Sequence, residues 1–197
     1  MLRTVNKAAK GLIRDFYEVE NLQVSQKGPG NFVSMADKRT EDFLTKELMA
    51  ARPDYSFLLE EAGEIIGSNK EYRFIVDPLD GTSNFLHSLP YFCITIALER
   101  IYPDNSREII AAVTYAPILQ ELYWAEKGQG VWFESSGAKA QRLRIAKRTE
   151  LLTSLLCVGS LKQDLDIVSK INHEVSSVRC IGSTALALAY VASGKID

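Results

Sequence analysis

The sequence predicts an α+β fold that changes to an α/β pattern near residue 150. Two long helical patterns come first, a run of short strand patterns follows, and strands alternate with helices at the end. Amphipathic elements of this kind bury their apolar faces by stacking in layers. We therefore expect an N-terminal α+β domain over residues 1–148, with helices on an antiparallel sheet. Residues 149–197 would begin a second, α/β domain that is incomplete.

Two helices are predicted in the first fifty residues. Apolar residues recur at helical spacing from Leu2 to Val19, which predicts an amphipathic helix over the first twenty residues. The glycines and proline of segment 27–31 predict a loop. A second helix is expected to begin near Ser34, as its N-cap, and to end before Pro53.

Strand patterns dominate the middle of the chain. Short runs rich in β-branched and aromatic residues alternate with turn residues, which is typical of strands in a sheet. The strands expected in this part are 56–59, 72–76, 92–98, 109–114, 122–125, 131–133 and 142–145. The elements expected after residue 150 are a strand at 155–158, a helix at 164–174, a strand at 178–181 and a helix at 184–192.

Composition narrows the class of protein. The formal net charge is −2, with no basic stripe of the kind that nucleic-acid binding requires. No run of about 18 apolar residues predicts a membrane helix, and the first residues do not resemble a signal peptide. Three cysteines without Cys-x-x-Cys spacing are typical of reduced thiols, so we expect a cytoplasmic protein. With only two histidines, a metal ion would have to be held by carboxylates.

The segment from Asp77 to Phe85 carries the chemistry. Asp77 is expected where a strand ends, and Asp80 follows three residues later, so a tight turn would point both carboxylates to one side. Gly81 allows a backbone conformation that other residues avoid. Thr82 would then begin a helix whose free N–H groups can bind an anion. Hard oxygen ligands beside an anion site suit Mg²⁺ and a phosphate.

An ordinary hairpin turn is the alternative, since Asp-Gly between apolar runs is a common turn signal. The complete string of nine residues is more specific. It matches the signature of the inositol monophosphatase family, Asp-Pro-(Leu/Ile)-Asp-Gly-Thr-x-Asn-Phe, at every specified position. The chain resembles that family from its first helix to Asp197. The resemblance implies a layered αβαβα sandwich of the sugar-phosphatase type.

The resemblance also implies a set of metal ligands. Taken alone, the pair Glu60-Glu61 indicates a solvated strand end. In the family, the first glutamate of such a pair binds metal. The implied ligands are Glu60, Asp77, the carbonyl oxygen of Leu79, and Asp80. The complete family site holds two or three Mg²⁺ ions.

Catalytic roles follow from the same resemblance. Ser34 and Asp37 alone would indicate a helix cap. In the family this aspartate hydrogen-bonds the threonine of the main motif, so Asp37 would pair with Thr82. Thr82 would orient the attacking water, which Glu60 helps to place, and take its proton. Lys27 resembles a family lysine near the active site.

A third segment is implied to contact the substrate. Gly182, Ser183 and Thr184 precede an Ala/Leu-rich helix and alone would be an ordinary N-cap. In the family a loop of this kind binds substrate. The implied substrate-binding residues are Asp80, Gly81, Thr82, Gly182, Ser183 and Thr184.

The implied activity is Mg²⁺-dependent, lithium-sensitive hydrolysis of inositol 1-phosphate by a homodimer. Related activities on fructose 1,6-bisphosphate or adenosine 3′,5′-bisphosphate stay open, because the motif contacts phosphate and metal and not the alcohol. A non-catalytic regulatory or binding protein is a further alternative. Family members continue beyond Asp197 through a Trp-Asp-x-Ala-x-Gly segment that completes the second metal site. Whether the chain is a shortened protein or a fragment of a longer one stays open. As it stands, we expect it to hold one ion and to be inactive or nearly so.

Overall fold

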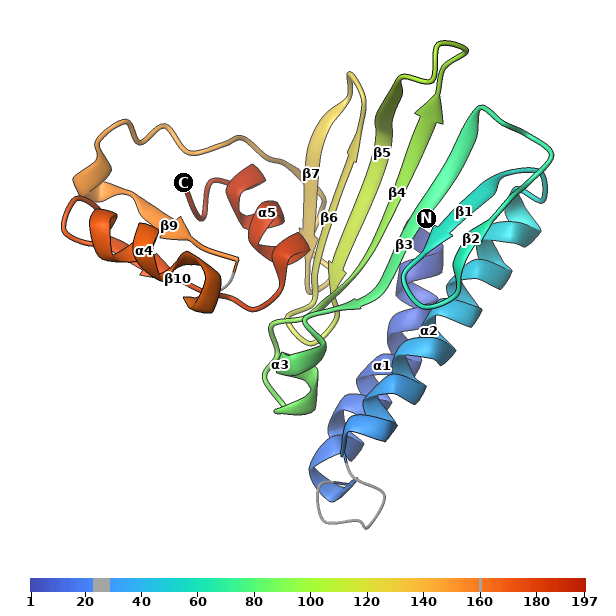
Figure 1. The fold of residues 1–197 in the computed structure, drawn as a ribbon, viewed down its shortest axis with the longest axis horizontal. Helices are drawn as coiled ribbons and strands as arrows, with labels where there is room; N and C mark the ends of the chain where they lie inside the picture. The colour runs from blue at the N-terminus through green and yellow to red at the C-terminus, as the bar shows by residue number, and fades with distance from the viewer. Residues whose placement is uncertain (23–28, 160) are drawn as a thin grey trace.

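The computed structural model describes residues 1–22, 29–159 and 161–197, with side chains described outside 20–34 and 160–163 (Figure 1). The chain begins with helix α1 (Leu2–Leu22), which confirms the first predicted helix. One face of α1 is buried, and Val5, Leu12 and Val19 on that face are fully inaccessible. In the described residues, no helix has the length and apolar content that crossing a membrane requires.

Helix α2 spans Pro29–Ala51, so it begins earlier than predicted. The expected loop at 27–31 is wrong for residues 29–31, and Ser34 lies inside the helix instead of capping it. Proline is well suited to the first turn of a helix, because the N–H that it lacks would have no partner there. Lys27 lies outside the described residues.

The strands before residue 150 form one eight-stranded sheet in the order β2-β1-β3-β4-β5-β6-β7-β8. All neighbours are antiparallel except β1 and β3, which run in parallel. The sheet is therefore mixed, with one exception to the predicted antiparallel pattern. The strands are β1 (Ser56–Leu59), β2 (Gly63–Ile65), β3 (Tyr72–Asp80), β4 (Cys93–Ile101), β5 (Arg107–Ala116), β6 (Glu121–Glu126), β7 (Gly130–Ser135) and β8 (Gln141–Arg142).

Three strands differ most from the prediction, while β4 and β5 also run further than expected, to Ile101 and Ala116. Strand β2 was not expected, because Gly63 and Glu64 are poor strand formers in sequence. Strand β3 continues past residue 76 to Asp80, so Asp77 lies within the strand and not at its end. Strand β8 has only two residues, which pair with Trp132 and Phe133 of β7, and this segment is basic and exposed.

The two faces of the sheet are covered by different parts of the chain. Ile94 and Leu122 belong to the core that α1 and α2 form on one face. Their neighbours Cys93 and Tyr123 point to the opposite face and pack with Leu186 of α5 (Thr184–Ala192). Figure 1 shows the layers in sequence, with α1 and α2, the large sheet, and then α5.

A short helix, α3 (Thr82–Leu86), follows β3 at one end of the sheet. Its Phe85 is fully buried and contacts Phe16 of α1 and Phe92, with ring centroids 5.7 and 5.1 Å away. This aromatic cluster holds the end of the Asp77–Phe85 segment against the core.

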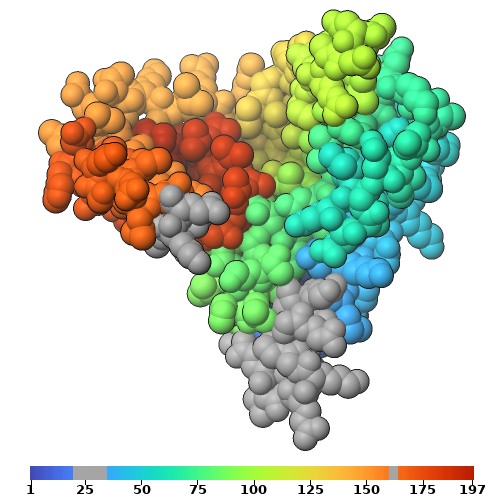
Figure 2. All heavy atoms as spheres, in the orientation of Figure 1, coloured from blue at the N-terminus to red at the C-terminus, as the bar shows by residue number. Residues whose placement is uncertain are grey.

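The last fifty residues alternate between strands and helices, as predicted. After a 3₁₀ turn (Leu151–Thr153), strands β9 (Leu155–Cys157) and β10 (Ser177–Arg179) pair in parallel, and α4 (Leu161–Ile171) connects them. Helix α5 lies between these strands and the large sheet (Figure 1). In the space-filling view, the C-terminal part meets the rest of the chain beside the green region that includes α3 (Figure 2). The division into domains at residue 148 stays a prediction.

Candidate active site

A bulge in β3 places two aspartates on one side of the sheet. Asp77 is opposite Thr95 of β4, and Asp80 is opposite Cys93. Three residues of β3 thus span the length of two residues of β4, which is the mark of a β-bulge. Side chains alternate along a regular strand, so residues three apart would point to opposite faces. The extra residue brings Asp77 and Asp80 to the same face, by a bulge and not by the tight turn expected from sequence.

Glu60 is brought beside Asp77 by the parallel pairing of β1 and β3. Leu59 is opposite Val76, so Glu60 and Asp77 are the next residues on two neighbouring strands. Burial raises the pKa of Asp77 to about 8, and the nearby carboxylates of Glu60 and Asp80 add to the rise. The N–H of Leu79 donates to Asp77 Oδ1 at 3.1 Å, and this hydrogen bond lowers the pKa of Asp77 and so offsets part of the rise.

Asp80 joins the bulge to the first turn of α5. Its Oδ2 accepts hydrogen bonds from the Ser183 hydroxyl at 2.6 Å and from the Ala185 N–H at 2.7 Å. Ser183 is buried, whereas Gly182 and Thr184 on either side are exposed. The structure thus brings the two segments that the sequence singled out, at 77–85 and at 182–184, into direct contact.

Gly81 has the conformation that only glycine adopts readily, with φ 98°. A Cβ at this position would lie 2.8 Å from the carbonyl oxygen of Tyr91. Thr82 follows as the first residue of α3 and is exposed, with its hydroxyl donating to the Leu79 carbonyl oxygen at 3.0 Å.

Asp37 is buried on α2, with 4% of its surface exposed. Its expected hydrogen bond with Thr82 is not formed, because the Thr82 hydroxyl donates to Leu79 instead. In the described part of the chain, Asp37 Oδ1 has no hydrogen-bond partner. Burial raises the pKa of Asp37 to about 7, and the negative charges of Glu60, Glu61 and Glu41 contribute.

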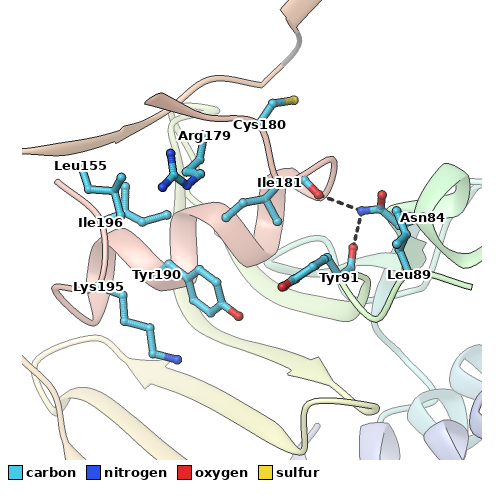
Figure 3. A pocket seen from close by; sticks show the side chains of 10 residues that line it. All are labelled: Asn84, Leu89, Tyr91, Leu155, Arg179, Cys180, Ile181, Tyr190, Lys195 and Ile196. Atoms are coloured by element: carbon cyan, nitrogen blue, oxygen red, sulfur yellow. Dashed lines mark hydrogen bonds between the residues drawn. The ribbon is translucent and has the colours of Figure 1, made fainter. Parts of the chain in front are cut away.

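Two residues that sequence reasoning missed shape the site. Asn84 Nδ2 donates to the carbonyl oxygens of Tyr91 at 2.6 Å and Ile181 at 2.8 Å, which fixes the 181–184 loop beside α3 (Figure 3). Its presence at a specified position of the nine-residue signature was the only available signal. Glu41 of α2 is fully buried and accepts backbone N–H groups of the turn after β1.

The carboxylates at the end of β3 and β1 have the chemistry of ligands for a divalent cation. Within residues 1–22, 29–159 and 161–197, no three Asp, Glu, His or Cys side chains form a ready-made metal cluster. Glu60, Asp77 and Asp80 nonetheless crowd one another, and a nearby cation would relieve the repulsion that raises the pKa of Asp77. Among the described residues, Asp37 adds a buried oxygen without a hydrogen-bond partner. Such a donor set suits Mg²⁺, which keeps several water ligands and needs few from protein.

Two cavities border the 181–184 loop. One of about 140 Å³ is lined by Gly182, Ser183 and Thr184, together with residues of β9 and α5. A larger one of about 600 Å³ lies where Asn84 and Tyr91 face Tyr190 and Lys195 (Figure 3). The larger cavity is not lined by the aspartates, so volume alone does not locate the chemistry.

Comparison with known proteins agrees with this geometry. Residues 1–197 match the model of the inositol monophosphatase family. An inositol-1-monophosphatase of Mesorhizobium japonicum is 45% identical over 204 residues, which cover 100% of this chain and 73% of that protein. The Nus factor SuhB of Escherichia coli K12 is 34% identical over 203 residues, covering 100% and 72%. The crystal structure of the extragenic suppressor protein suhB from Bartonella henselae has a TM-score of 0.85 and 40% identity, and covers 100% of this chain and 73% of that one.

Proposed function

The chain belongs to the inositol monophosphatase family, and from this premise we propose that it hydrolyses a small phosphate monoester with the help of Mg²⁺, inositol 1-phosphate being the favoured substrate. The family assignment makes the chain a phosphoric monoester hydrolase. The observation that carries the finer proposal is the β3 bulge, which gathers Asp77 and Asp80 on one face beside Glu60.

The proposed ligands of one Mg²⁺ are Glu60, Asp77 and the carbonyl oxygen of Leu79. Asp77 and Asp80 would contribute to a second ion. Bound Mg²⁺ supplies charge that makes a water ligand more acidic and offsets the negative charge of the phosphate. Asp80 Oδ2 already accepts hydrogen bonds from Ser183, Ala185 and the Cys93 thiol, so its other oxygen is the one left for a cation.

Thr82 and Asp37 are the proposed groups for moving the proton of the attacking water. Thr82 is exposed at the start of α3, and its hydroxyl can turn from the Leu79 carbonyl toward a water. Asp37 has a pKa of about 7 before any cation binds, so it can take up a proton near neutral pH. The backbone N–H groups of Gly81 and Thr82 would hold the phosphate oxygens where negative charge develops.

The 182–184 loop is the proposed contact for the alcohol part of the substrate. Gly182 and Thr184 are exposed beside the smaller cavity. The Ser183 hydroxyl is committed to Asp80, so its part is to hold the loop in place. Gly182 has φ 75° and lies against Asn84, so a larger residue there would push the loop away from α3.

Phosphate release from inositol 1-phosphate, with and without Mg²⁺, tests the proposal in a version of the chain extended by the family's C-terminal segment. The Asp77→Asn variant should lose the Mg²⁺-dependent signal, and Asp104→Asn, in an exposed turn where the carboxylate accepts from Ser106, serves as control. Fructose 1,6-bisphosphate and adenosine 3′,5′-bisphosphate assayed in parallel would identify the substrate. Equal release by wild type and Asp77→Asn would contradict the proposal. Lithium inhibition and a homodimer stay predictions.

A regulatory role is the second candidate, because the relative at 34% identity is named a Nus factor. The two functions make different predictions for one experiment. If the extended version binds Mg²⁺ but releases no phosphate from any of the three substrates, the binding role is favoured. Mg²⁺-dependent release that is lost in Asp77→Asn would favour the enzyme.

A further inference from the structure

Glu41 is a buried carboxylate that the proposed mechanism does not use. It lies one helical turn after Asp37 on α2, and only 2% of its surface is exposed. A glutamate is almost never fully buried unless its charge is compensated. The groups that compensate it therefore indicate what it does.

The partners of Glu41 are two consecutive backbone N–H groups. The Glu61 N–H donates to Oε2 at 2.8 Å, and the Ala62 N–H donates to Oε1 at 2.9 Å. Each carboxylate oxygen thus accepts one charge-assisted hydrogen bond. In the described part of the chain, no lysine, arginine or histidine forms an ion pair with Glu41.

These two N–H groups belong to the turn that carries Glu60. Strand β1 ends at Leu59, and its pairing with β2 begins again at Gly63. Residues 60–62 are therefore the complete connection between the two strands. The pairing of β1 with β3 fixes the residue before Glu60, and Glu41 fixes the two residues after it.

We propose that Glu41 is a positioning residue, whose hold on the 60–62 turn keeps the Glu60 carboxylate beside Asp77 for a shared divalent cation. This inference rests on the proposed function. Glu60 itself is exposed, so burial restrains its side chain little, although its carboxylate interacts with that of Asp77. The backbone of its turn is what can be held, and Glu41 is the group that holds it.

Two variants separate the position of the turn from the charge of Glu41. Glu41→Gln keeps the size of the side chain, but its amide group offers one acceptor oxygen for two N–H donors. Glu41→Asp keeps the charge but is one methylene shorter, so it cannot reach both N–H groups in the same way. Glu99→Gln is the control, because Glu99 is also buried but pairs with Arg73, which is opposite Ser56 at the other end of β1 from the turn.

Three measurements on the full chain test the inference, namely calorimetry with Mg²⁺ and Mn²⁺, amide hydrogen exchange at Glu61 and Ala62, and thermal unfolding. Replacing a group that orients a metal ligand typically costs about 10–100-fold in metal affinity. We expect a loss of this size in Glu41→Gln and Glu41→Asp, with faster exchange at both amides. Glu99→Gln should unfold at a lower temperature and bind metal as the wild type does.

Each contrary result has a distinct meaning. Metal affinity within about twofold of wild type in both Glu41 variants would overturn the inference and leave the proposed function standing. Weak binding by Glu41→Gln but wild-type binding by Glu41→Asp would assign the effect to charge and overturn positioning. If either variant fails to fold, the other carries the test. An absence of metal binding by the wild type would overturn the proposed function and this inference together.

Discussion

Asp80 accepts a hydrogen bond from the hydroxyl of Ser183 at 2.6 Å, although the two residues are 103 positions apart in the chain. The bond joins the bulged end of β3 to the start of α5. The Ser183 side chain is buried. The acceptor is a carboxylate, and a hydrogen bond to a charged group is stronger than one between neutral groups. The position of the 182–184 loop thus depends on a residue that is also a proposed metal ligand.

Replacing Ser183 with alanine should therefore destabilise the chain. A hydrogen bond to a charged group contributes about 1.5–3 kcal/mol, and we expect a loss in that range. Thermal unfolding would measure it, as a decrease of about 2–4 °C for each kcal/mol. Ser193→Ala is a matched control, since its hydroxyl donates to the neutral carbonyl oxygen of Tyr190. Equal effects of the two variants would show that the Asp80 carboxylate gives the bond no special strength.

Asp77→Asn should remove most Mg²⁺ and Mn²⁺ binding. The change takes a negative charge from the position that faces both Glu60 and Asp80. We expect affinity to fall by at least about 10-fold, since Mg²⁺ needs carboxylates to offset the cost of losing its waters. Calorimetry would measure the affinity, with Asp104→Asn as control. Unchanged affinity in Asp77→Asn would exclude a carboxylate metal site at the bulge.

The stability of the metal-free chain should fall as pH rises. Asp37 and Asp77 have folded-state pKa values of about 7 and about 8, above the ordinary value of 3.8. A carboxyl group with a raised pKa favours the folded state fully below its unfolded pKa and loses that contribution as pH rises through its folded pKa. The window therefore runs from about pH 4 to about pH 8.

Thermal unfolding in a chelator from pH 5 to pH 9 would measure this loss. Asp77→Asn cannot ionise at this position, so its unfolding temperature should depend less on pH and exceed that of wild type at the alkaline end. Added Mg²⁺ should reduce the wild-type decline, because a bound cation favours the ionised form. If the unfolding temperatures of wild type and Asp77→Asn changed with pH in the same way, the pKa of Asp77 would not be raised in the folded chain.

In a version of the chain extended by the family's C-terminal segment, Thr82→Ala should lower turnover by about 10²-fold or more, the scale of losing a group that assists proton transfer. Metal affinity should stay near wild type, because the side chain of Thr82 is not a proposed ligand. Thr153→Ala is a close control, since its hydroxyl also donates to the carbonyl oxygen three residues earlier. Thr82→Ser should recover most activity. Turnover within about twofold of wild type in Thr82→Ala would exclude a catalytic hydroxyl at this position.

Local patterns were sufficient to predict most elements and the main motif. The helix over 184–192 was predicted with the bounds that the structure shows, because a run of Ala and Leu follows a serine and a glycine. The start of α2 was missed, since Pro29 and Gly30 favour loops and first helical turns alike. Sequence pattern alone does not distinguish these two uses.

The contacts that complete the candidate site were beyond such patterns. The bulge between Asp77 and Asp80 depends on pairing with Thr95 and Cys93, which no local rule specifies. Glu41 looks like any helical glutamate until the turn after β1 is folded against it. Both features are set by partners far away in the chain, whereas helix and strand periodicity reports only on near neighbours.

Because β1 and β3 run in parallel, both strands end on the same side of the sheet, and this limits how related sequences can vary. The carboxylates lie at the end of the sheet where β1 and β3 finish. The tight connections at 102–106 and 127–129 lie at the opposite end of the strands (Figure 1). Insertions at 102–106 would leave the carboxylates in place. A single insertion or deletion in β3 before Asp77 would turn that residue to the other face. Homologous chains should therefore differ in length at the far end and keep a constant number of residues between Tyr72 and Asp80.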